Sequence, residues 1–290
     1  MTQSERVIVL TGASSGIGAA AADVLASQGA HLAVVGRNPE RAKTVADRVG
    51  GESYVADYDH LDDVRALADA LLARYQRIDV LANNAGGLIS NRAMTVDGHA
   101  RTIQSNHLAP FLLTNLLLPR LLECAADAPV RVVSTASMAN LFGQLRLDDL
   151  DWQKRSWRGG WQAYGTAKLS NILFVRELAE RTTGTGIEAF SFHPGTVVTG
   201  FGATSPLIKF GNLVTGGHYG IGPARGAMPL IALTSSAPIG APSGTYFDRL
   251  TPNGRVNAQA RDPQLARDLW ALSARLVGLS ASATGTAFAG

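Results

Sequence analysis

The sequence has few charged residues, few cysteines and few histidines, and each shortage excludes a class of protein. Charged residues make up 17% of the 290 residues and the formal net charge is only +3, so nothing indicates a polyanion such as nucleic acid as a partner. The single cysteine, Cys124, cannot form an internal disulfide, which is compatible with a reducing compartment. The six histidines show no spacing typical of metal ligands, so we expect no metal site.

Long apolar runs are also missing. The most apolar stretch, 111–118, is too short to span a membrane and contains Thr114 and Asn115. A first strand is expected within a few residues of Met1, which predicts that there is no signal peptide. We find no internal repeat, linker or composition break. We therefore expect a cytoplasmic protein without a membrane partner, with one domain over residues 1–280 and a flexible tail over 281–290.

The chain is organised around residues 5–18. An apolar run, Val7 to Leu10, predicts a buried strand, and Thr11-Gly-Ala-Ser-Ser-Gly-Ile-Gly18 leads from it into a helix. This layout directs backbone N–H groups and the positive end of a helix dipole at a diphosphate. Gly12 would allow the turn, Gly16 the close approach of phosphates, and Gly18 tight helix packing. The spacing differs from G-x-G-x-x-G, and a turn without a ligand is the alternative interpretation.

The end of the second strand bears on the choice of cofactor. An acidic residue there would bind a ribose 2′-hydroxyl and repel a 2′-phosphate, but the sequence has Gly36-Arg37-Asn38. The Arg37 guanidinium suits a 2′-phosphate, which it can hold with charge-assisted hydrogen bonds. We therefore expect NADP(H) rather than NAD(H). The alternative is a solvated arginine at a helix start.

Strand and helix patterns alternate along the chain. This alternation predicts an α/β fold, a single-domain Rossmann doubly wound parallel sheet of about seven strands with helices on both faces. Strands are expected within 7–10, 31–35, 52–57, 78–87, 130–137, 186–195 and 243–249. Helices are expected at 39–49, 61–75, 95–124 with a break at Pro110, 164–181, 223–234 and 263–277. We interpret the glycine-rich segment 196–226 as a substrate lid.

A tyrosine and a lysine on one predicted helix suggest the chemistry. Tyr164 and Lys168 stand four residues apart and so share one helix face. An ammonium group beside a phenol should lower the tyrosine pKa and make Tyr164 a general acid, although this spacing alone is a weak signal.

Trp152, Trp157 and Trp161 either border a substrate mouth or pin a surface loop.

Taken together, these motifs resemble the short-chain dehydrogenase/reductase superfamily. The matching elements are Thr11-Gly-x-x-x-Gly16-x-Gly18, Asn83-Asn-Ala-Gly86, Asn106, Ser137, Tyr164-x-x-x-Lys168 and His193-Pro-Gly195, in the same order and at similar spacing. Stretches such as SNHLAPFLLTNLLLP and YGTAKLSNILFVREL resemble its retinol dehydrogenase-like branch. The resemblance covers nearly the whole chain.

The resemblance implies roles for four catalytic residues. Tyr164 would exchange a proton with the substrate oxygen, and Ser137 would hydrogen-bond that oxygen. Lys168 would hold the nicotinamide ribose, and Asn106 would hold a water that links Lys168 to solvent. The cofactor would contact Gly12, Ser14, Ser15, Gly16, Ile17, Gly18, Arg37, Asn38, Asp57, Tyr58, Asn83, Ala85, Gly86, Tyr164, Lys168, Pro194, Gly195, Val197 and Thr199.

Our main hypothesis is hydride transfer between NADPH and a carbonyl of a bulky, apolar small molecule, or the reverse oxidation of an alcohol. Alternatives are reduction of an imine or iminium carbon, and a non-catalytic NADP(H) sensor. A sugar-nucleotide epimerase would need a larger C-terminal domain. A Ser–His hydrolase built on His193 would need a G-x-S-x-G elbow, and the sequence matches that pattern only inside the glycine-rich turn, at Gly12-Ala-Ser-Ser-Gly16. An apolar stripe of Phe111, Leu112 and Leu116 suggests a homodimer or, equally, ordinary core packing.

Overall fold

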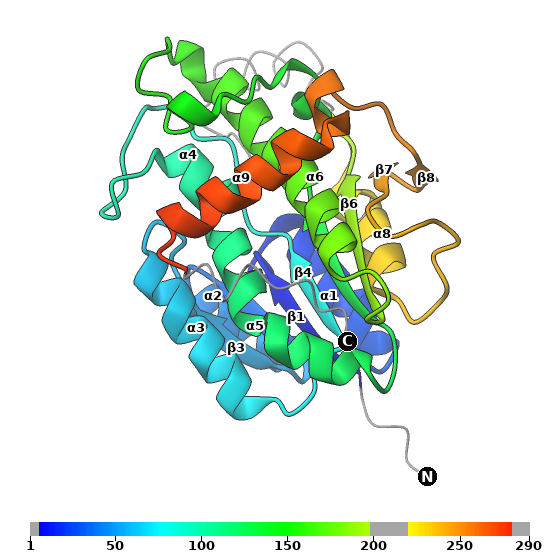
Figure 1. Ribbon diagram of the computed structural model, residues 1–290. Coiled ribbons are helices and arrows are strands. Elements are labelled where there is room, and N and C mark those ends of the chain that lie inside the picture. Colours follow the sequence, from blue (N-terminus) through cyan, green and yellow to red (C-terminus); the bar gives the residue numbers. More distant parts are fainter. Residues whose placement is uncertain (1–5, 198–219, 280–290) are drawn as a thin grey trace.

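The computed structural model describes residues 6–197 and 220–279. They form an eight-stranded sheet in the order β3-β2-β1-β4-β5-β6-β7-β8 (Figure 1). The strands are β1 (Val7–Thr11), β2 (His31–Gly36), β3 (Glu52–Val55), β4 (Val80–Asn83), β5 (Val130–Thr135), β6 (Ile187–His193), β7 (Tyr246–Asp248) and β8 (Thr251–Pro252). All pairs are parallel except β7 with β8. The doubly wound sheet is confirmed; the prediction missed β8, which is too short to carry a residue pattern.

Helices cover both faces of the sheet. One face carries α1 (Gly16–Ser27), α2 (Pro39–Val49) and α8 (Pro223–Thr234). The other carries α3 (Leu61–Arg74), α5 (Ala109–Ala125), α6 (Trp161–Arg181) and α9 (Pro263–Leu276) (Figure 1). Because strand side chains alternate between faces, Ile8 and Leu10 join the core under α1, while Val9 joins the core under α5. This two-sided burial explains why the strands are apolar almost throughout.

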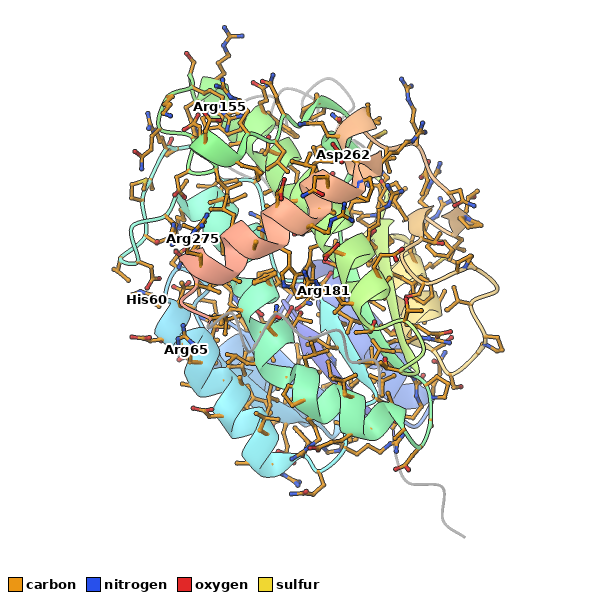
Figure 2. The ribbon with its side chains drawn as sticks, viewed as in Figure 1. His60, Arg65, Arg155, Arg181, Asp262 and Arg275 are labelled. Atoms are coloured by element: carbon orange, nitrogen blue, oxygen red, sulfur yellow. The ribbon has the colours of Figure 1, made fainter. Side chains whose placement is uncertain are left out.

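Local signals set several helix ends where they were predicted. Helix α2 starts with Pro39 after Asn38, whose side chain accepts a 2.8 Å hydrogen bond from the Arg41 N–H. Helix α9 starts in the same way, with Asp262 accepting from the N–H groups of Gln264 and Leu265 (Figure 2). These caps satisfy N–H groups that a helix start otherwise leaves unpaired.

The predicted helix over 95–124 is wrong at its start. Residues 95–100 form a turn in which the Thr95 N–H donates to the His99 carbonyl, and the helix begins with α4 (Arg101–Ile103). A π-helical segment, η1 (Gln104–Leu108), then joins α4 to α5. Pro110 has no N–H to donate back into the preceding turn, which accounts for the irregular hydrogen bonding just before it.

The continuous helical stretch Arg101–Ala125 is long and apolar enough to cross a membrane by length and composition, and 72% of its most apolar window is buried inside the fold. Phe111 and Leu112 of the predicted dimer stripe are fully buried in this core. Phe111 packs edge-on against Trp270 of α9, with ring centres 5.0 Å apart. Helix α9 thus covers Phe111 within the chain, which favours the core-packing interpretation for that residue, and the homodimer stays a prediction.

Candidate active site

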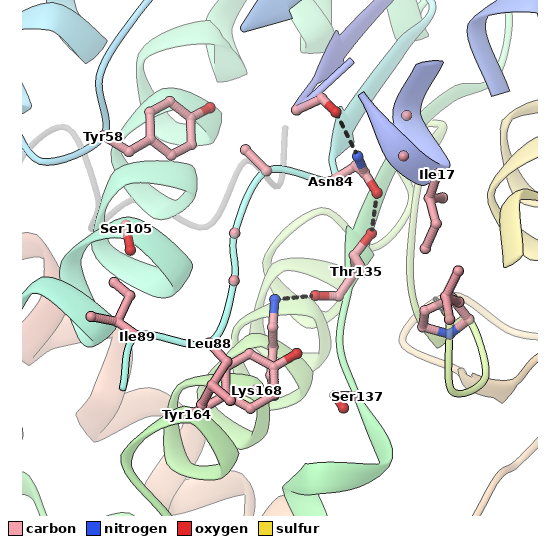
Figure 3. A pocket seen from close by; sticks show the side chains of 18 of the residues that line it. Ile17, Tyr58, Asn84, Leu88, Ile89, Ser105, Thr135, Ser137, Tyr164 and Lys168 are labelled. Atoms are coloured by element: carbon pink, nitrogen blue, oxygen red, sulfur yellow. Dashed lines mark hydrogen bonds between the residues drawn. The ribbon is translucent and has the colours of Figure 1, made fainter. Parts of the chain in front are cut away.

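A cavity of about 1340 Å³ opens at the carboxyl edge of the sheet, where β1, β2, β4, β5 and β6 end (Figure 3). Ligands of open α/β sheets bind at this edge. Every motif that the sequence singled out contributes to its wall, although not every predicted residue does. The predicted residues that line it are Gly12, Ser14, Ser15, Gly16, Ile17, Gly18, Arg37, Asp57, Tyr58, Ala85, Gly86, Ser137, Tyr164, Lys168, Pro194, Gly195 and Val197.

The glycine-rich turn has the conformation that its sequence predicts. Gly12 and Gly16 have φ values of +65° and +58°. A residue with a Cβ atom adopts such a positive φ only with strain. A Cβ on Gly12 would also lie 2.8 Å from the Ala85 Cα. Ser15 precedes α1 and its side chain makes no capping hydrogen bond, so the first N–H groups of α1 stay available to an anion in the cavity.

Asn84 ties the turn to two neighbouring strands. Its side-chain nitrogen donates to the Thr11 carbonyl at 3.0 Å, and its side-chain oxygen accepts from the Thr135 hydroxyl at 3.2 Å (Figure 3). The predicted contact at Asn83 is wrong, because the Asn83 side chain donates to the Thr114 hydroxyl of α5 at 2.8 Å and lies in the core. Neighbouring strand residues point to opposite sides, a signal that could have favoured Asn84.

Two arginines stand where β2 meets α2. Arg37, as predicted, and Arg41, which the sequence analysis missed, both line the cavity. Among the described residues neither is ion-paired with an acidic side chain. Asn38 does not line the cavity and instead caps the helix turn that carries Arg41. The four-residue spacing from Arg37 was the signal available for Arg41.

Three of the four predicted catalytic residues meet at the middle of the cavity (Figure 3). Ser137 forms a side-chain hydrogen bond with Tyr164. The Lys168 Nζ lies 5.6 Å from the centre of the Tyr164 ring and donates to the Thr135 carbonyl at 2.9 Å. Ser134, although close in sequence, is buried and does not line the cavity.

Asn106 supports the backbone beside the cavity, and the water that it would hold stays a prediction. It is fully buried and does not line the cavity. Its side-chain oxygen accepts from the Gly87 N–H at 3.0 Å, and its nitrogen donates to the carbonyls of Gly87 and Thr102 at 3.0 and 2.9 Å. Through these backbone hydrogen bonds Asn106 holds the Gly86–Gly87 turn in place beside Lys168.

Burial dominates the ionisation of this group. It raises the pKa of Tyr164 well above its ordinary range, which the hydrogen bond from Ser137 only partly offsets. It lowers the pKa of Lys168 to about 7. Lys168 is therefore only partly charged near neutral pH and donates to Thr135, and its lowering of the tyrosine pKa stays a prediction.

The wall beyond Tyr164 is largely apolar. It is formed by Leu88, Ile89, Met138, Ala139, Phe142 and Trp161. Met138 and Phe142 are each 49% exposed, so both large apolar side chains offer surface at the cavity.

The three tryptophans divide between the two interpretations. Trp161 lines the cavity and meets the Tyr164 ring edge-on at 6.4 Å. Trp157 pins its loop by donating from Nε1 to the Ser90 carbonyl at 2.6 Å. Trp152 is buried with the Arg155 guanidinium 3.4 Å from its ring centre, so only Trp161 borders the mouth.

Three predictions fall wholly or mostly outside the described residues. They are the cofactor contact at Thr199, the substrate lid over 196–226 and the tail over 281–290. Within the described ranges, no group of three or more His, Cys, Asp or Glu side chains could hold a metal ion.

Residues 6–148 match the family model described as short chain dehydrogenase. The chain is 38% identical to DnrU of Streptomyces sp. (strain C5), which carries the provisional name daunorubicin C-13 ketoreductase, over 94% of this chain and 93% of that protein. The chain belongs to the short-chain dehydrogenase/reductase family. It is also 34% identical to human retinol dehydrogenase 13, over 95% of this chain and 86% of that protein, which confirms the retinol dehydrogenase-like resemblance.

A solved structure supports the same assignment. An uncharacterised Mycobacterium paratuberculosis protein shares the fold with a TM-score of 0.74 and 35% identity, over 95% of this chain and 94% of that one. As a member of this family, the protein is an oxidoreductase of carbonyl or alcohol groups that uses a nicotinamide dinucleotide.

Proposed function

We propose that the protein is an NADP(H)-dependent oxidoreductase that reduces a ketone or aldehyde of a bulky, mainly apolar molecule, or oxidises the corresponding alcohol. The observation that carries this proposal is one continuous cavity. It joins a phosphate-type turn and two arginines, Arg37 and Arg41, to the Ser137–Tyr164–Lys168 group and then to an apolar wall.

The residues present fit the dinucleotide. The uncapped N-terminus of α1 would hold its diphosphate. Arg37 and Arg41 would hold a 2′-phosphate through charge-assisted hydrogen bonds, and this pair is the basis for preferring NADPH. Pro194 and Gly195 would lie at the nicotinamide end beside Tyr164. The reduced nicotinamide supplies the hydride that the reaction needs.

The protein residues would manage the proton. The raised pKa of Tyr164 keeps its phenol protonated at neutral pH, the form that a general acid requires in carbonyl reduction. Ser137 would donate to the same carbonyl oxygen and stabilise its developing negative charge. A phosphate-bearing cofactor near Lys168 would favour the charged lysine, which would then ease proton loss from Tyr164.

The apolar wall supports the substrate class. Burial of apolar surface contributes roughly 25 cal/mol per Å², and this wall offers a substrate aliphatic and aromatic side chains. The ketoreductase name of the Streptomyces relative favours a ketone. Imine or iminium reduction remains the second candidate, since it needs the same hydride geometry.

The test begins with calorimetric titration of NADPH and NADH, followed by a carbonyl screen with deuterated NADPH. We expect NADPH to bind more tightly and deuterium to appear at the carbinol carbon. Tyr164→Phe should lower turnover about a hundredfold to ten-thousandfold, the usual contribution of general acid catalysis, and should retain NADPH binding. Binding without turnover of any carbonyl or imine by the wild type would favour the sensor alternative.

A further inference from the structure

The segment that carries Ser137 is a short 3-10 helix, η2 (Met138–Phe142), with Ser137 as its N-terminal cap. Its hydroxyl accepts from the Ala139 N–H at 3.2 Å. Such short helices have little stability of their own. The position of the Ser137 hydroxyl therefore depends on what holds this segment.

Helix α6 holds one side of the segment. A Cβ on Gly165 would lie 2.5 Å from the Ala139 carbonyl oxygen, and a Cβ on Gly143 would lie 2.5 Å from the Gly165 carbonyl oxygen. The two backbones therefore touch directly, one residue beyond Tyr164. This contact fixes how closely the segment approaches α6, and other residues must hold the rest of the segment.

Asn140 and Asn257 hold the far side. Asn140 is fully buried, and its side-chain nitrogen donates to the Ser137 carbonyl at 2.8 Å. Its side-chain oxygen accepts from the backbone N–H of Asn257 at 3.0 Å. The Asn257 side chain in turn donates to the carbonyls of Gly143 and Leu141 at 2.9 and 3.3 Å. Asn257 comes from the connection between β8 and α9, 117 residues after Asn140.

We propose that Asn140 and Asn257 are positioning residues that hold Ser137 in reach of Tyr164 and the substrate oxygen. The proposal rests on the proposed function, in which Ser137 stabilises the reacting oxygen. Neither asparagine lines the cavity, so both act through Ser137. A displacement of about 1 Å in a catalytic group can lower the rate about a hundredfold.

The test is a double-mutant cycle in which single-turnover kinetics with NADPH and a ketone substrate give the rate constant of each variant. Asn140→Ala and Asn257→Ala should each lower the rate constant about tenfold in the wild type. The dissociation constant of NADPH should stay unchanged. In a Ser137→Ala background the same changes should cost less than about twofold, because residues that act through one group are not additive.

Gln259→Ala is the matched control. Gln259 lies in the same connection, but within the described part of the chain its side chain bonds to the backbone of Leu145, at 2.9 Å in both directions, and not to the segment 137–143. We expect its rate constant within about twofold of the wild type. Asn257→Ser is the milder variant if Asn140→Ala does not fold. Equal losses in the wild-type and Ser137→Ala backgrounds would overturn the proposal, as would unchanged rates.

Hydrogen exchange separates this proposal from the proposed function. Asn140→Ala and Asn257→Ala should speed amide exchange in peptides covering 137–143, whereas Gln259→Ala should not. If the wild type turned over no carbonyl, the proposed function would fail, and exchange would then decide whether the two asparagines hold the segment. Unchanged exchange would overturn the positioning role.

Discussion

The Lys168 Nζ donates a 2.9 Å hydrogen bond to the Thr135 carbonyl at the end of β5. This bond anchors the lysine beneath the cavity, and burial lowers its pKa to about 7. The lysine is therefore only partly charged at neutral pH. A buried amine of this kind has consequences for stability that can be measured.

The free energy of unfolding should rise with pH between about 7 and 10. Lys168 has a pKa of about 7 in the folded protein against an ordinary value of 10.5, so in this range the unfolded chain binds the extra proton and alkali favours folding. Lys168→Met should flatten this rise. Urea denaturation at pH 7 and pH 9 measures it, with Lys43→Met, at an exposed helix site, as control. An equal rise in the wild type and in Lys168→Met would contradict the lowered pKa of Lys168.

Arg41→Ala should weaken NADPH binding about tenfold and leave NADH binding unchanged, because a charge-assisted hydrogen bond contributes about 1.5–3 kcal/mol. Arg37→Ala should have a similar effect. Arg48→Ala is the control on the same helix, since Arg48 is paired with Asp23 at 2.7 Å and does not line the cavity. Calorimetric titration measures all three. An equal loss of affinity for NADPH and NADH would show that the arginines do not bind a 2′-phosphate.

Thr11→Val should destabilise the fold by about 2–4 kcal/mol, since each buried group left unpaired costs about 1–3 kcal/mol. The Thr11 hydroxyl accepts from the N–H groups of Asn84 and Ala85, both at 3.0 Å. Thr44→Val, on an exposed helix face, serves as the comparison. Chemical denaturation checks the difference, and equal stability of the two variants would argue against this role for Thr11.

Phe142→Ala should raise the KM for large apolar ketones roughly fivefold to thirtyfold, the equivalent of about 1–2 kcal/mol of lost apolar contact. A small ketone that does not reach this wall should be unaffected. Steady-state kinetics across ketones of increasing size, with exposed Val96→Ala as control, gives the comparison. A size-independent change in KM would place the substrate elsewhere.

Local patterns predicted most of the sheet and the helix starts. Pro39 and Asn38 marked the beginning of α2, and the apolar run at Val7–Leu10 marked β1. These signals depend on neighbours within a few residues, which sequence reports directly. The predicted start of the helix over 95–124 was wrong for the same reason. A turn and a π-helical segment leave the local apolar pattern intact, so the pattern does not reveal them.

The sequence by itself determined the family, the sheet and the identity of most cavity residues, since strand ends and short motifs carry that information. Only the tertiary structure decided which side of a strand faces the cavity, so that Asn84 replaces Asn83. It also decided that burial, rather than the Tyr164–Lys168 spacing, controls their pKa values. Burial and long-range partners such as Asn257 depend on elements distant in sequence, and no local pattern records them.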